Sequence, residues 1–124
     1  MSLSSILRTR PETTPIAVLE LCGEVNTETA FELETALNEI LKTRDQLILD
    51  LSRVLYVSSA GWRTLIDRGS QGGRVRLRIV GMQPSVREVF ELLGLTTVLI
   101  SYDSVDAALA AYLDDTGLDA PRPK

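Results

Sequence analysis

The stretch LILDLSRVLYVSSAGWRTLI, residues 47–66, carries the clearest structural signal in the chain. A short apolar segment, residues 46–51, is typical of a buried strand. After a short loop, residues 58–68 are predicted to form a helix that begins at the serine pair Ser58 and Ser59. Backbone N–H groups at a helix start have no helical carbonyl to accept them, so polar chemistry is expected at this turn.

The serine pair has two interpretations. Serines begin helices routinely as N-caps, which stabilise a helix by about 1 kcal/mol. The same position also suits a phosphate group, because free N–H donors and the positive end of the helix dipole lie there. Phosphorylation would add a charge of roughly −1.5 to −2. The residues alone leave both interpretations open.

The rest of the chain alternates strands and helices. Asn26 or Thr27 is expected to cap the clearest helix. Strands are predicted over residues 4–10, 16–22, 74–80 and 95–101, and helices over 27–42, 84–93 and 105–113. This alternation predicts an α/β fold, with a mixed, mainly parallel sheet of four to five strands and about four helices.

Three arginines indicate how the helices are distributed. Arg74, Arg76 and Arg78 alternate with apolar residues, which is unexpected for a strand covered on both faces. We therefore expect the helices to pack mostly on one face and these arginines to lie on a solvated face. Residues 4–113 are predicted to form a single domain, and residues 114–124, with a glycine and two prolines, a loose tail.

Composition excludes several classes of function. The 13 basic and 17 acidic residues give a net charge of −4, which argues against nucleic-acid binding. With no histidine and one cysteine, neither a zinc site nor a Ser-His-Asp arrangement is expected. Asp50 and Asp67 have no visible partner for acid–base chemistry, so we expect no catalytic residue and no cofactor. The absence of a long apolar run or signal pattern predicts a cytoplasmic protein without membrane contact.

Three single residues have structural interpretations first. Cys22 is expected to be a small core residue. Phe31 lies off the apolar stripe of its helix and is expected to be a partly covered surface residue. Trp62 suits either the core or an exposed anchor beside the serines.

The serine-containing stretch resembles the signature of the STAS domain (sulfate transporter and anti-sigma factor antagonist), in which a strand leads to Asp-Ser-Ser-Gly or a close variant at a helix start. Three further segments, residues 21–30, 72–95 and 102–108, resemble other parts of that family in the same order. The resemblance covers roughly residues 6–113 and implies a STAS-like single domain.

The resemblance also implies a function. Alignment on Gly61 makes Ser59 the phosphorylated residue, with Ser58 as second choice. Ser58 and Asn26 then stand where the family has acidic residues. The unphosphorylated chain would bind an anti-sigma factor serine kinase and release a sigma factor, with a phosphatase reversing the modification. The expected partner-binding residues are Asn26, Ser58, Ser59, Ala60, Gly61, Trp62 and Arg63.

Two further expectations concern the oligomeric state and an alternative function. The chain is expected to be a monomer or weak dimer. The alternative function is a phosphorylation-independent STAS module acting as a scaffold, a sensor or a small-ligand-binding domain. The loss of acidic residues at Ser58 and Asn26 motivates that alternative.

Overall fold

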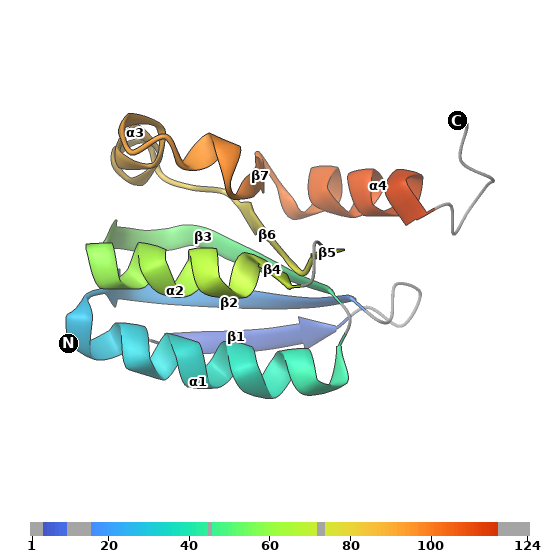
Figure 1. The fold of residues 1–124 in the computed structure, drawn as a ribbon, viewed down its shortest axis with the longest axis horizontal. Helices are drawn as coiled ribbons and strands as arrows, with labels where there is room; N and C mark the ends of the chain where they lie inside the picture. The colour runs from blue at the N-terminus through green and yellow to red at the C-terminus, as the bar shows by residue number, and fades with distance from the viewer. Residues whose placement is uncertain (1–3, 10–15, 45, 72–73, 117–124) are drawn as a thin grey trace.

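The computed structural model describes residues 4–9, 16–44, 46–71 and 74–116. Its strands are β1 (Ser4–Thr9), β2 (Ile16–Val25), β3 (Gln46–Val57), β4 (Ser70–Gln71), β5 (Arg74–Val75), β6 (Leu77–Val80) and β7 (Ile100–Tyr102). Its helices are α1 (Thr27–Thr43), α2 (Ser59–Gly69), α3 (Pro84–Leu92), the 3-10 turn η2 (Leu95–Thr97) and α4 (Val105–Thr116). Figure 1 shows α1 and α2 lying side by side against the strands.

The main sheet has five strands in the order β1-β2-β3-β6-β7. Strand β1 is antiparallel to β2, and the other neighbouring pairs are parallel. The predicted mixed, mainly parallel sheet with four α-helices is therefore confirmed.

The larger core lies between the sheet and the helices α1, α2 and α3. Alternate strand residues such as Leu19 and Leu49 point into it, because successive side chains of a strand face opposite sides. Leu33 of α1, Leu65 of α2 and Phe90 of α3 close the core from the helical side. Helices α1, α2 and α3 all contribute buried residues to this cluster, so three of the four α-helices pack on one face of the sheet.

Helix α4 covers part of the opposite face. Ala108 and Leu109 pack there with Ile16, Val18 and Ile48 in a smaller apolar cluster. This face is thus less open than the arginine pattern predicted.

The prediction that Arg74, Arg76 and Arg78 share a solvated face is wrong for the two whose side chains the structure describes. Arg78 is only 6% exposed and donates to Gln46 Oε1. Arg76 is half-buried and donates to the carbonyls of Leu41 and Arg44, each at 3.0 Å. These acceptors lie more than 30 residues away, so local periodicity could not reveal them.

The predicted strand over 74–80 is also broken at Arg76, which separates β5 from β6. Strand β5 pairs with β4 in a separate two-stranded sheet, and only β6 joins the main sheet. The Arg76 carbonyl nonetheless accepts from the Leu47 backbone N–H at 2.9 Å, which aligns β6 beside β3.

Strands β2 and β3 extend further than predicted, to Val25 and Val57. The segment between Leu51 and Ser58, expected to be a loop, continues β3 because it pairs with the end of β2. Register shifts in β2 on either side of Cys22 accompany this extension. Cys22 is exposed rather than buried, because its neighbour Leu21 faces the core and the side chain of Cys22 points to the opposite face of the strand.

The predicted strand over 95–101 is mostly helical turn. Leu95 and Leu99 are both buried, and the Leu99 N–H donates to the Leu95 carbonyl at 2.9 Å. That i,i+4 spacing is helical, so only Ile100–Tyr102 forms a strand. At the other end, α4 continues to Thr116, three residues past its predicted end; residues 117–124 of the expected tail lie outside the described residues.

The two phenylalanines allow a matched test of the core. Phe90 is 0% exposed and contacts Trp62, whereas Phe31 is 72% exposed. Replacing Phe90 with Ala should lower the free energy of unfolding by about 3–5 kcal/mol. Replacing Phe31 with Ala should change it by no more than about 0.5 kcal/mol. Urea denaturation followed by Trp62 fluorescence measures both, and equal losses would contradict this placement of the core.

Candidate functional site

The carboxyl ends of β2 and β3 meet at one edge of the sheet. Val25 pairs with Val57, and the Ser58 N–H donates to the Val25 carbonyl at 2.7 Å. Helices α1 and α2 begin directly after these strands. Two helix N-termini, each with its positive dipole end, therefore lie next to each other.

Asn26 caps the first of these helices. Its Oδ1 accepts from the N–H groups of Glu28 at 3.0 Å and Thr29 at 2.9 Å. In return Thr29 Oγ1 accepts from the Asn26 N–H at 2.8 Å, which completes a capping box. The predicted cap is thus Asn26 rather than Thr27, and its side chain is committed to the helix start.

Ser58 caps the second helix. Its Oγ accepts from the Gly61 N–H at 3.1 Å, and its carbonyl accepts from the Trp62 N–H at 2.9 Å. Ser58 is only 8% exposed. Its hydroxyl is therefore buried and engaged, as the capping interpretation of the serine pair requires.

Ser59, by contrast, is the first residue of α2 and is exposed. Its hydroxyl forms no hydrogen bond with any other described residue. The N–H groups of Ser59 and Ala60 likewise have no hydrogen-bond partner in the described part of the chain. The first turn holds no acidic side chain. An accessible hydroxyl thus stands on a helix terminus that favours negative charge.

Gly61 and Trp62 pack the start of α2 against the core. A Cβ on Gly61 would lie 2.7 Å from Val25 Cγ1 and 2.9 Å from Val57 Cγ1, so only glycine allows α2 to sit this close to both strands. Trp62 is 3% exposed, with its ring centroid 5.7 Å from that of Phe90. Of its two predicted placements, the structure has the buried one, although its Nε1 lacks a hydrogen-bond partner within the described chain.

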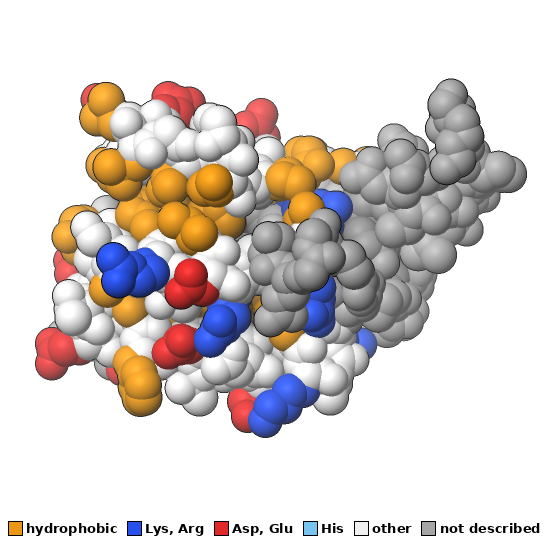
Figure 2. All heavy atoms as spheres, viewed as in Figure 1, with side chains coloured by type: hydrophobic (Ala, Val, Ile, Leu, Met, Phe, Trp, Pro, Cys, Tyr) orange, Lys and Arg blue, Asp and Glu red, His pale blue; other side chains and the backbone are white. Residues whose placement is uncertain are grey.

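Two shallow clefts flank α2, and Ser59 and Arg63 line both of them. The cleft toward α1 also includes Phe31, Glu34 and Asp67. The cleft on the other side is apolar and is lined as well by Trp62, Ile66, Leu93 and Leu95. Figure 2 shows apolar side chains gathered over this part of the molecule, with basic and acidic side chains beside them.

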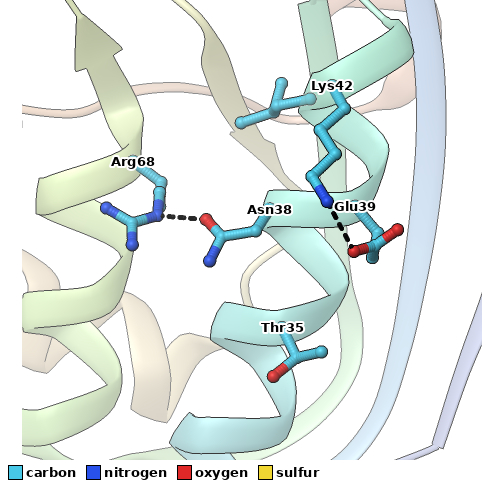
Figure 3. Close-up of a pocket in the computed structure, with 6 residues that line it drawn as sticks. Thr35, Asn38, Glu39, Lys42 and Arg68 are labelled. Carbon is cyan, nitrogen blue, oxygen red and sulfur yellow. Dashed lines mark hydrogen bonds and ion pairs between the residues drawn. The ribbon is translucent and has the colours of Figure 1, made fainter.

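A third groove lies farther along α1 and α2 (Figure 3). Arg68 donates there to Asn38 Oδ1 at 2.7 Å and to Glu34 Oε2 at 2.9 Å. Lys42 is paired with Glu39 at 3.0 Å. The two Arg68 contacts link α2 to α1, whereas the Lys42–Glu39 pair lies within α1.

The seven residues expected at the site come together, but they differ in accessibility. Ser59 and Arg63 are exposed, Asn26 and Ala60 are half-buried, and Ser58, Gly61 and Trp62 are buried. Two cleft residues, Ile66 in one cleft and Asp67 in the other, are not among the residues expected at the site. They follow Ser59 by seven and eight residues, about two helical turns, so helical periodicity could have indicated them.

The described residues include no cluster of three or more His, Cys, Asp or Glu side chains suited to a metal ion. Within the same residues, no helix is both long and apolar enough to cross a membrane.

Comparison with known proteins gives a consistent result. The STAS domain model matches residues 8–108. BtrV of Bordetella bronchiseptica, described as an anti-sigma factor antagonist, is 37% identical over 95 residues, which cover 74% of this chain and 82% of BtrV. RsfB of Mycobacterium tuberculosis, an anti-sigma-F factor antagonist, is 29% identical over 96 residues, which cover 76% of this chain and 79% of RsfB.

Solved structures show the same fold. An anti-sigma factor antagonist from Mycobacterium paratuberculosis superimposes with a TM-score of 0.76 and 25% identity, covering 88% of this chain and 92% of that one. The anti-sigma factor antagonist SpoIIAA in its unphosphorylated form gives a TM-score of 0.69 at 18% identity, covering 88% and 96%.

The adjacent serines are expected to respond differently to truncation. Replacing Ser58 with Ala removes the cap of α2 and should lower the free energy of unfolding by about 1 kcal/mol. Replacing Ser59 with Ala removes no hydrogen bond to a described residue and should change it by less than about 0.5 kcal/mol. Urea denaturation of the two variants provides the comparison, and a larger loss for Ser59→Ala would show that the roles are reversed.

Gly61→Ala tests the close approach of α2 to the sheet. Overpacking against Val25 and Val57 should destabilise the protein by about 1–3 kcal/mol. Alanine's higher helix propensity offsets up to about 1 kcal/mol of this. Adding Val25→Ala removes the nearest methyl group, so the double variant should lose less stability than the sum of the single variants. Additive losses in thermal unfolding would refute a steric origin.

Proposed function

The chain belongs to the STAS domain family and, within it, to the anti-sigma factor antagonists, and on that premise we propose that it is a binding protein switched at Ser59. In this proposal the unphosphorylated chain binds an anti-sigma factor that is also a serine kinase, and the sigma factor is released. The kinase transfers the γ-phosphoryl group of ATP to Ser59 Oγ. ADP leaves, the hydroxyl proton passes to the kinase, and the complex dissociates. The chain is a substrate of this reaction and not an enzyme.

The observation that carries the proposal is the division of roles between the two serines. Ser58 is buried and its hydroxyl caps α2, whereas Ser59 is exposed at the first helical residue. A kinase can reach the Ser59 hydroxyl without opening the helix, and phosphorylation there leaves the cap intact. Ser58 is the weaker candidate, because its modification would remove the cap and require exposure of a buried group.

The surroundings of Ser59 explain how a phosphate would disrupt binding. The residue lies between two clefts, one of them largely apolar. A partner that covers this surface would have to desolvate the added dianion or place it beside its own acidic groups. The modification therefore changes the binding free energy far more than the stability of the chain. A phosphatase that removes the group would restore binding.

The alternative of a phosphorylation-independent scaffold, sensor or small-ligand-binding module has one specific observation in its favour. Ser58 and Asn26 stand where the resemblance leads us to expect carboxylates. Both side chains are occupied as helix caps. A module that no longer served a kinase could keep these residues for folding alone.

Binding variants distinguish the two functions. A Ser59→Ala chain used as bait should recover the anti-sigma factor, which is then identified by mass spectrometry, purified and titrated by calorimetry. The unphosphorylated parent and Ser59→Ala should bind it with similar affinity. Ser59→Asp should bind at least about 10-fold more weakly, because it places a charge in the interface.

Ser104→Asp is the matched control. Ser104 is an exposed serine whose Oγ accepts from the Ala107 N–H at the start of α4, so aspartate there also preserves a cap. This variant should bind like the parent. Equal binding by Ser59→Ala and Ser59→Asp, with no phosphate found on Ser59 after incubation with the partner and ATP, would favour the scaffold or ligand-binding module.

A further inference from the structure

Arg63 lies one helical turn after Ser59 on α2. Residues four apart on a helix are neighbours on its surface. Both side chains are exposed, and both line the two clefts that flank α2. A group attached to Ser59 Oγ would thus lie within reach of the Arg63 guanidinium.

Arg63 is also uncommitted, unlike other arginines of the helical face. Arg68, on the same helix, is held by Asn38 and Glu34, and Arg87 lies 3.6 Å from Asp103. Arg63 makes neither a hydrogen bond nor an ion pair with any other residue that the structure describes. Its positive charge is therefore available to bind a group that the described residues do not supply.

We propose that Arg63 is the receptor for the phosphate of phosphorylated Ser59, binding it together with the free N–H groups of Ser59 and Ala60. This inference rests on the proposed phosphorylation of Ser59. The guanidinium fork matches phosphate oxygens in pairs, and the helix start supplies further donors. The ligand is therefore a phosphate monoester dianion that belongs to the chain itself.

The pairing adds a second effect to phosphorylation. In the unphosphorylated chain, Arg63 points its charge toward a partner and favours an acidic residue there. After phosphorylation, the phosphate occupies Arg63, so the partner meets an added anion and also loses a cation. The acidic side chains facing the same cleft are Glu34, which is already paired with Arg68, and Asp67. Both disfavour the dianion, which makes Arg63 the group that offsets them.

The second pKa of phosphoserine, about 6 in the absence of partners, measures this pairing directly. Phosphoserine is incorporated at position 59 during translation, and the full chain is titrated by phosphorus NMR at 0.15 M salt. A neighbouring guanidinium favours the dianion and lowers this pKa. Arg63→Gln should raise it by about 0.3 unit, a two-fold weaker preference for the dianion, and Arg63→Lys by about half as much.

Arg53→Gln is the control, because Arg53 is an exposed arginine on β3 outside both clefts. It should titrate like the parent. Coincident titrations of the parent and Arg63→Gln, or an equal shift for Arg53→Gln, would overturn the proposal. The measurement needs no kinase, so a chain that pairs phosphoserine with Arg63 but is never phosphorylated by its partner would refute the proposed function alone.

Discussion

The parallel pairing of Val25 with Val57 is the constraint on which the site depends. It ends β2 and β3 at the same level, so the helices that follow them begin side by side. The close approach of α2 at Gly61 and the hydrogen bond from Ser58 N–H to the Val25 carbonyl then hold the second helix against both strands. Each backbone contact here involves a residue adjacent to a cap, so strand register and helix capping reinforce each other.

That arrangement explains why the sequence places the serine pair at a helix start but does not show which of the two serines is the cap. Ser58 and Ser59 have the same side chain and the same intrinsic preference for a cap. The choice between them depends on which residue first adopts helical geometry, and β3 decides this by pairing as far as Val57. The extension of β3 was itself missed, because exposed apolar residues such as Leu55 and Tyr56 obscured the alternation.

Much of the fold could be predicted, because the main core follows regular periodicity. The apolar stripe and N-terminal cap of α1 predict that helix, and Pro84 and Gly94 mark the ends of α3. Short apolar runs predict the buried parts of β2 and β3. The errors fall where a distant partner determines the outcome. Arg76, between β5 and β6, donates to carbonyls at the end of α1, and Arg78 is buried with Gln46 accepting its hydrogen bond. The clefts beside Ser59 have the same origin, since they combine α2 with side chains from α1, from η2 and from Leu93, which follows α3.

The neutral residues at the two helix starts change the electrostatics of the site without changing its architecture. Asparagine, aspartate and serine are comparable caps, so Asn26 and Ser58 maintain both helices in place of acidic residues. What they remove is negative charge next to Ser59, while Arg63 adds positive charge one turn away. In purely electrostatic terms, both features would favour a phosphate on Ser59. Under the proposed switch, the phosphate would then be stable on the antagonist itself, and its lifetime would depend on how readily a phosphatase displaces Arg63 from it.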